Sequence, residues 1–132
     1  MHIHIGTSGW NYDHWSGAFY PEGMKSGDWF AYYAEKFHTV EINNTFYQLP
    51  KPETFDKWRE NAPAGFFFAV KASRYITHMK KLKDPADSVA RFFEAAAGLG
   101  DRLGPVLFQL PPNWRANPER LDAFLSGLPA GH

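Results

Sequence analysis

The 132-residue sequence contains no cysteine, which excludes disulfides, thiolate nucleophiles and cysteine-based zinc sites and fits a reducing compartment. Its 14 basic and 14 acidic side chains cancel, so no overall field attracts nucleic acid or an anionic membrane. No segment approaches the ~20 consecutive apolar residues that span a bilayer, and the start lacks the pattern of a signal peptide. These absences predict a cytoplasmic protein without membrane contact, whose chemistry depends on serine, lysine, histidine and carboxylates.

Aromatic residues, by contrast, are abundant at 17%, within a hydrophobic fraction of 44%. This composition supplies enough apolar surface for a core, and the length is that of one folded unit. No linker, low-complexity segment or shift in composition divides the chain. We therefore expect a single domain over residues 1–132.

Short apolar runs alternate with helical stripes four times, a pattern that predicts an α/β fold with a parallel sheet. The predicted strands are His2–Thr7, Thr39–Asn43, Phe66–Lys71 and Pro105–Leu110. Helix starts are indicated by capping residues and by proline at the first helical position. These starts are Ser26-Gly27-Asp28, Lys51-Pro52-Glu53, Asp84-Pro85 and Asn117-Pro118.

Polar residues stand at or near the ends of three predicted strands, namely Glu41, Asn43, Lys71 and Gln109. Parallel strands bring their carboxyl ends to one edge of the sheet, where α/β proteins place their sites. Because burying these groups alone is unfavourable, we expect Glu41 to pair with Lys71 and the two amides to complete the hydrogen bonding. The cluster is then either a functional site or a self-satisfied polar plug.

The charge state of Lys71 also has two interpretations. Beside a carboxylate the ammonium group stays charged and can bind an anion, whereas a desolvated lysine can act as a base or form an imine. In the basic loop that follows, Arg74 can grip phosphate or carboxylate, and His78 can exchange a proton near neutral pH or serve a structural role.

The loop after the first predicted strand contains Ser8 and Trp10 within Gly6-Thr7-Ser8-Gly9-Trp10. Ser8 either contacts a ligand or makes a turn hydrogen bond. Trp10 and Tyr47 lie near strand ends, where they can stack on bases or sugars or simply cover the mouth of the sheet. Neither the G-x-x-x-x-G-K-[ST] loop nor G-x-G-x-x-G occurs, so those modes of nucleotide binding are unsupported.

Metal ligation by His4, His14, Glu41 and His78 has no support from spacing, because neither H-x-x-x-H nor H-E-x-x-H is present. We predict no metal site, and no cofactor follows from these residues.

Several ordered strings carry a specific family resemblance. They are Gly6-Thr7-Ser8-Gly9-Trp10, Phe19-Tyr20-Pro21, Val40-Glu41-Ile42-Asn43-Asn44-Thr45-Phe46-Tyr47, Phe68-Ala69-Val70-Lys71-Ala72, Ile76-Thr77-His78 and Leu107-Phe108-Gln109-Leu110-Pro111-Pro112. Together they resemble the YecE-like family, also called domain of unknown function 72. The resemblance covers nearly the whole chain and implies a TIM-like (β/α)₈ barrel, without supplying an activity.

A complete barrel of this type typically takes roughly 250 residues. The resemblance therefore implies that the chain comprises the N-terminal half of the barrel, about four β/α units, and is truncated before the C-terminal half. Unpaired edge strands in such a half barrel would favour homo-oligomers.

The leading functional hypothesis is an enzyme-type barrel that binds an anionic substrate, phosphate-bearing or sugar-like, at the carboxyl ends of its strands. Glu41, Lys71 and His78 are the candidate catalytic residues. The candidate substrate-binding residues are Ser8, Trp10, Asn43, Tyr47, Arg74 and Gln109. Two alternatives stay open: a nucleic-acid-binding or nuclease-like protein, and a non-catalytic barrel fragment or interaction module.

Overall fold

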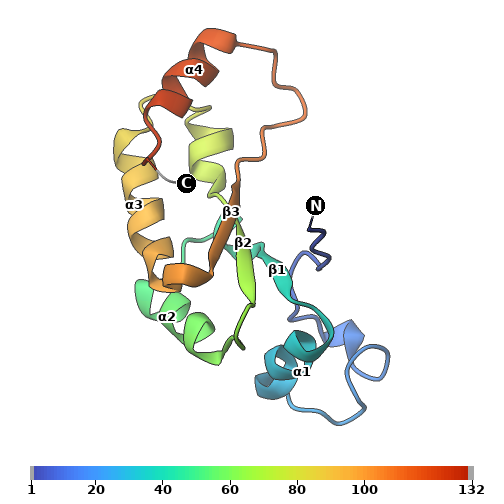
Figure 1. The fold of residues 1–132 in the computed structure, drawn as a ribbon. Helices are drawn as coiled ribbons and strands as arrows, with labels where there is room; N and C mark the ends of the chain where they lie inside the picture. Colours follow the sequence, from blue (N-terminus) through green and yellow to red (C-terminus); the bar gives the residue numbers. More distant parts are fainter. Residues whose placement is uncertain (1, 131–132) are drawn as a thin grey trace.

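Three short, mainly apolar segments form a parallel sheet. In the computed structural model, which describes residues 2–130, the strands are β1 (Thr39–Ile42), β2 (Phe67–Lys71) and β3 (Leu103–Leu107). They lie in the order β1-β2-β3, as Figure 1 shows. The register places Glu41 opposite Ala69 and Lys71 opposite Leu107.

Helices precede, connect and follow the strands. They are α1 (Trp29–Lys36), α2 (Pro52–Asn61), α3 (Ala86–Ala96) and α4 (Pro118–Ser126). Shorter 3₁₀ helices cover Asp13–Trp15, Ser26–Asp28, Asn44–Phe46 and Ala97–Arg102. A π-helix, Tyr75–Met79, follows β2.

Two of the predicted helix starts are confirmed. Pro52 opens α2, and the Asn117 side-chain oxygen accepts a hydrogen bond of 3.0 Å from the Arg120 backbone N–H at the start of α4. Capping by Asp84 and by the Ser26–Asp28 segment was wrong. Asp84 has a φ of 42° in the turn before Pro85, so its backbone does not lead into the helix, and α3 has no side-chain cap. The Ser26–Asp28 segment is itself a 3₁₀ turn leading into α1.

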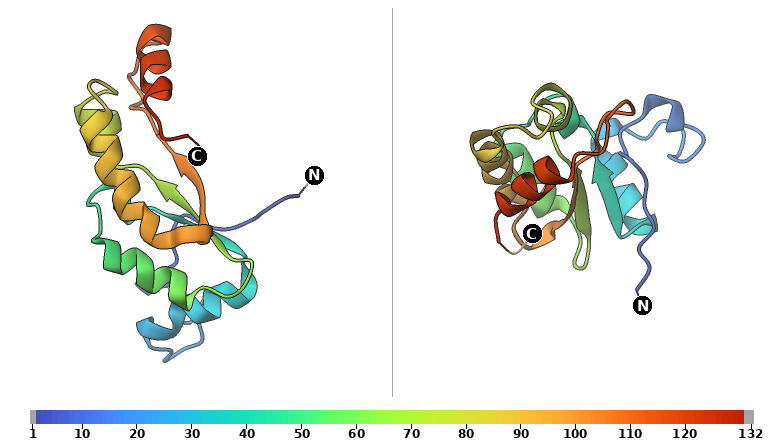
Figure 2. Two further views of the ribbon diagram at one scale, coloured as in Figure 1. Left: turned by 60° about the vertical axis from the view of Figure 1, so that its left-hand side comes forward. Right: turned by 90° about the horizontal axis from the view of Figure 1, so that it is seen from above.

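One face of the sheet is buried under the helices. Val40 and Ile42 of β1 and Phe68 and Val70 of β2 alternate toward that side and belong to the main hydrophobic cluster. Figure 2 shows α2 and α3 on one side of the strands, and Phe30 of α1 packs against Phe66 and Phe68. Since each large apolar side chain gains about 1.5–3 kcal/mol on full burial, this face supplies most of the stabilisation of the sheet.

The opposite face is only partly covered. Glu41, Ala69 and Lys71 alternate onto it and are half-buried, and Leu107 of β3 is 42% exposed. Purely parallel sheets are usually covered on both faces. The open face therefore leaves the predicted polar residues accessible.

The predicted strand His2–Thr7 does not form, so three parallel strands stand where four were expected. Only its end joins the sheet: the Glu41 N–H donates to the Thr7 carbonyl and the Gly9 N–H to the Glu41 carbonyl, both at 2.9 Å. Ile3 and Ile5 are 73% and 70% exposed, so the preceding residues gain too little burial to extend the pairing.

The fourth predicted strand is displaced toward the N-terminus. β3 spans Leu103–Leu107 rather than Pro105–Leu110, and Gln109 lies two residues beyond it. Pro105, which lacks an N–H, is tolerated because β3 pairs only with β2 in the described sheet. Among residues 2–130, no helix is long and apolar enough to cross a bilayer.

Candidate functional site

Glu41 is bound by serine and not by lysine. The Ser8 hydroxyl donates a 2.8 Å hydrogen bond to Glu41 Oε1, and the two residues also face each other in a parallel backbone bridge. No ion pair links Glu41 to Lys71 in the part of the chain that the structure describes, so that predicted contact was wrong. The register explains the difference, because Glu41 faces Ala69 while Lys71 lies two positions further along β2.

Lys71 instead lies over an aromatic ring. Its Nζ is 4.9 Å from the centroid of Phe46, the distance of a cation–π contact. The same Phe46 ring meets the edges of Tyr47 and His78, each at a centroid distance of 5.1 Å. We call Phe46, Tyr47, Lys71 and His78 the Phe46 cluster. It gathers three of the predicted site residues around one ring that the sequence did not single out.

A buried threonine holds the base of the Phe46 cluster. The Thr45 hydroxyl lies 2.6 Å from the Lys71 carbonyl and 3.0 Å from the Ile42 carbonyl, so its one proton is shared between the ends of β1 and β2. Thr45 has no exposed surface. The contact fixes the turn that carries Phe46 and Tyr47 against the end of β2.

The loop after β2 brings two further predicted residues beside this cluster. The Arg74 guanidinium carbon is 5.7 Å from the centroid of Tyr47, and His78 Nδ1 is 2.8 Å from the Thr77 hydroxyl oxygen. His78 belongs to the π-helix, a rare conformation that is frequent at functional sites. Lys71, Arg74 and His78 thus form a basic edge around Phe46 and Tyr47.

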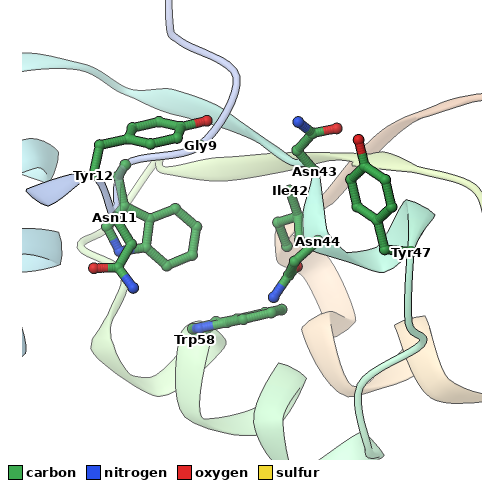
Figure 3. Close-up of a pocket in the computed structure, with 9 residues that line it drawn as sticks. Gly9, Asn11, Tyr12, Ile42, Asn43, Asn44, Tyr47 and Trp58 are labelled. Atoms are coloured by element: carbon green, nitrogen blue, oxygen red, sulfur yellow. The ribbon is translucent and has the colours of Figure 1, made fainter.

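On the other side of Tyr47 lies a pocket of about 380 Å³. Its side chains are aromatic, amide or aliphatic, and none is charged. They are Trp10, Tyr12, Tyr47 and Trp58, then Asn11, Asn43 and Asn44, with Gly9 and Ile42 completing the wall. Figure 3 shows Asn43 and Tyr47 on one side of the opening, Asn11 and Tyr12 on the other and Trp58 at the base. We call this the aromatic–amide pocket.

Asn43 carries an unmet hydrogen-bonding capacity. Its side-chain oxygen is buried and accepts no hydrogen bond within residues 2–130. A buried acceptor without a donor costs about 1–3 kcal/mol, so such groups are uncommon in a folded protein. The predicted self-satisfied network of Asn43, Gln109, Glu41 and Lys71 is therefore not what the structure contains.

Trp10 is held in the pocket wall by a buried tyrosine. The Tyr20 hydroxyl donates to the Trp10 carbonyl, and the Tyr20 ring stacks on Trp29 at 4.8 Å with an interplanar angle of 1°. Burial, and secondarily the neighbouring Tyr33, raises the pKa of Tyr20 from 10.0 to about 12. The hydroxyl therefore keeps its proton and its donor role at neutral pH.

Eight of the nine predicted site residues thus fall into three places. Trp10, Asn43 and Tyr47 line the aromatic–amide pocket, Lys71, Arg74 and His78 surround Phe46 and Tyr47, and Ser8 binds Glu41. Gln109 is exposed beyond β3, and across residues 2–130 no hydrogen bond links it to the other candidates.

The sequence reasoning missed Asn11, Tyr12, Asn44 and Trp58, which line the pocket. Asn11 and Asn44 adjoin the predicted residues Trp10 and Asn43, and Tyr12 lies two residues beyond Trp10, so their place in the same two loops was a signal. Trp58 gave no such signal, because an aromatic residue on a helix ordinarily packs against the core.

Four residues considered for a metal site do not converge. His4 packs edge-on against Phe67 at 4.8 Å, whereas His14 lies beside Tyr12 at 5.5 Å. Across residues 2–130, no group of three or more histidine or acidic side chains is placed to hold a metal ion.

Comparison with known families places the chain among proteins without an assigned function. The sequence matches the family described as "Protein of unknown function DUF72" over residues 4–132. It is 35% identical over 130 residues to the UPF0759 protein YecE of Escherichia coli strain K12, covering 96% of this chain and 44% of that protein. It is 34% identical over 116 residues to the UPF0759 protein YunF of Bacillus subtilis strain 168, covering 83% of this chain and 40% of YunF.

Solved structures agree with this relationship. A DUF72 family protein from Thermotoga maritima superposes with a TM-score of 0.78 at 30% identity, covering 94% of this chain and 50% of that one. A DUF72 family protein from Enterococcus faecalis gives a TM-score of 0.73 at 20% identity, which concerns the fold alone, with 95% and 45% covered. The chain spans about half the length of these relatives or less.

Proposed function

The chain belongs to the DUF72 family of proteins of unknown function, and from that premise we propose that it binds a small anionic substrate, phosphate-bearing or sugar-like, at the carboxyl ends of its strands. The observation that carries the proposal is Lys71, a half-buried residue whose ammonium group has no carboxylate partner within residues 2–130. An anion is the partner that such a cation lacks.

The surroundings of Lys71 strengthen this argument. Arg74 lies beside Tyr47, and His78 contacts the same Phe46 ring as Lys71, so three basic side chains border one edge of the sheet. The neighbouring carboxylate, Glu41, is already hydrogen-bonded to Ser8. The positive charge at this edge is therefore available to a ligand.

We further propose that the fold is the N-terminal half of a TIM-like barrel. Two observations support it: the three strands are parallel in sequential order with helices on one face, and relatives of the chain are about twice as long. In a complete barrel the open face, with Glu41 and Lys71, would turn toward the barrel axis. The carboxyl ends of the strands would then form the mouth that holds the substrate.

The roles follow from the chemistry of the groups. Lys71 and Arg74 would stabilise negative charge on the substrate, and His78 would donate or accept a proton. Glu41 would act as acid or base, with the Ser8 hydroxyl fixing one of its oxygens. An orienting role for Gln109 stays a prediction.

A charge-removal experiment tests the anion site. Inorganic phosphate would be titrated by NMR into the protein and into Lys71→Met, with shift changes followed near Phe46 and Tyr47. Removing a charge-assisted contact is expected to weaken phosphate binding about tenfold or more. Lys36→Met is the matched control, because Lys36 Nζ also lies 4.9 Å from an aromatic centroid, that of Tyr32, but is 3.6 Å from Glu35 on α1. Equal phosphate binding by both variants would contradict the proposal.

Nucleic acid is a second candidate because Tyr47 is 65% exposed beside Arg74, a combination that can stack a base and contact a phosphate. Binding to single-stranded DNA would then weaken steeply with salt. A filter-binding titration without association at low salt would remove this candidate.

A further inference from the structure

We propose that the aromatic–amide pocket binds the neutral ring of the substrate, and that this ring is a sugar. The inference deepens the proposed function and rests on it for the position of the anionic group. The proposed function concerns the anionic group of the substrate, and the present inference gives the chemical class of the part that carries this group. The pocket is lined only by aromatic, amide, aliphatic and glycine residues, so a charged group placed there would lose hydration without a counter-charge.

The hydrogen-bonding groups of the pocket match hydroxyl groups. Each asparagine amide offers both a donor and an acceptor, and each sugar hydroxyl does the same. Asn43 and Asn44 approach the opening from one side and Asn11 from the other, as Figure 3 shows. The buried oxygen of Asn43 still lacks a donor within residues 2–130, and a rotation of the side chain that turns this oxygen into the pocket would let a ligand hydroxyl supply one. A ring that carries several hydroxyl groups would use all three amides.

The arrangement of the aromatic rings favours a sugar over a nucleobase. A flat base is held best in a slot between two parallel ring faces. Trp10 and Trp58 instead meet at 85° with centroids 5.7 Å apart, so they form a corner and not a slot. A puckered sugar ring can rest its C–H face on one indole while its equatorial hydroxyl groups reach the amides at the side.

Tyr47 connects this pocket to the basic edge. Its side chain lines the pocket, while its ring packs on Phe46 and lies 5.7 Å from the Arg74 guanidinium carbon. A ligand with its ring in the pocket can therefore direct an attached phosphate past Tyr47 toward Lys71 and Arg74. A sugar phosphate fits both regions at once.

The test measures binding of the sugar ring and binding of the phosphate group separately. NMR titrations would use glucose, xylose and ribose, their phosphates, adenine and inorganic phosphate. We expect at least one free sugar to bind and Asn43→Ala to weaken that sugar and its phosphate about five- to tenfold, without weakening inorganic phosphate. Lys71→Met should show the reverse pattern, weakening both phosphates but not the free sugar. Asn61→Ala is the control, since Asn61 is exposed on α2 and bonds only the Lys57 carbonyl within residues 2–130.

The outcomes distinguish this inference from the anion site. Phosphate binding that depends on Lys71, with no free sugar or sugar phosphate affected by Asn43→Ala, would overturn the sugar pocket and leave the anion site. Sugar binding lost in Asn43→Ala, with no phosphate effect of Lys71→Met, would support the sugar pocket and contradict the anion site. Adenine binding more tightly than every sugar would overturn the sugar assignment in favour of a base.

Discussion

The two faces of the sheet differ in burial, although the same strands contribute side chains to both. Toward the helices, Phe68 and Val70 have no exposed surface and pack in a continuous apolar cluster. On the other face, the alternate residues Ala69 and Lys71 are half-buried, and Lys71 rests on a ring without a carboxylate partner in the described chain. Stability is therefore concentrated on one face, while the other keeps polar groups whose bonding capacity is incompletely used.

This division is typical of sites built on a rigid scaffold. Residues that bind or react with a ligand must keep charge or hydrogen-bonding capacity free, at some loss of stability. Burial of apolar side chains on the helix side offsets this loss of stability. Substitutions on the helix-covered face are therefore expected to lower stability, whereas substitutions of the polar residues on the open face are expected to weaken ligand binding with little loss of stability.

The largest expected effect is on the helix side. Phe68→Ala removes a ring that has no exposed surface and stacks on Phe30 at a centroid distance of 5.8 Å, so it should lower the free energy of unfolding by about 3–5 kcal/mol. Leu107→Ala on the open face, where the side chain is 42% exposed, should cost about 1 kcal/mol. Urea unfolding measures both values. Similar losses at the two positions would remove the distinction between the faces.

A pH titration tests the helix side without creating a cavity. Because burial raises the pKa of Tyr20 from 10.0 to about 12, both states keep the proton below pH 10 and stability is unaffected there. Between pH 10 and 12 the unfolded state loses its proton first, so stability should fall by about 2 kcal/mol across this range.

Tyr20→Phe provides the comparison for that titration. The variant loses the hydrogen bond to the Trp10 carbonyl but has no phenolic proton at this position, so its stability should fall less steeply above pH 10. Free energies of unfolding measured between pH 9 and pH 12 give both curves. Parallel curves would assign the alkaline loss to other groups.

The smallest expected effects on stability are those of replacing Asn117 and Asn43. Asn117→Ala removes the hydrogen bond to the Arg120 N–H at the start of α4 and should cost about 1 kcal/mol. Asn43→Ala removes a buried oxygen that accepts no bond within residues 2–130, so the expected change in stability is near zero or slightly favourable. Thermal unfolding of both variants measures this. A larger loss for Asn43→Ala would mean that the amide is structural.

Local rules predicted the elements whose residues interact with near neighbours. β1 and β2 were predicted to within one residue, and Pro52 and Asn117 start α2 and α4. The same rules were wrong for His2–Thr7. An alternating pattern indicates that a segment can form a strand, whereas pairing and burial along its length depend on which surfaces the rest of the fold offers.

By itself, the sequence determined the α/β pattern, the family and the positions of Glu41, Asn43 and Lys71 near the ends of two parallel strands. Only the tertiary structure decided their partners: Ser8 for Glu41, Phe46 for Lys71, and no hydrogen-bond donor for the Asn43 oxygen within residues 2–130. It also brought Trp58 from α2 into the pocket wall. The physical reason is that strand alternation depends on adjacent residues, whereas a side chain's partner is whichever group of a distant segment packing brings within reach.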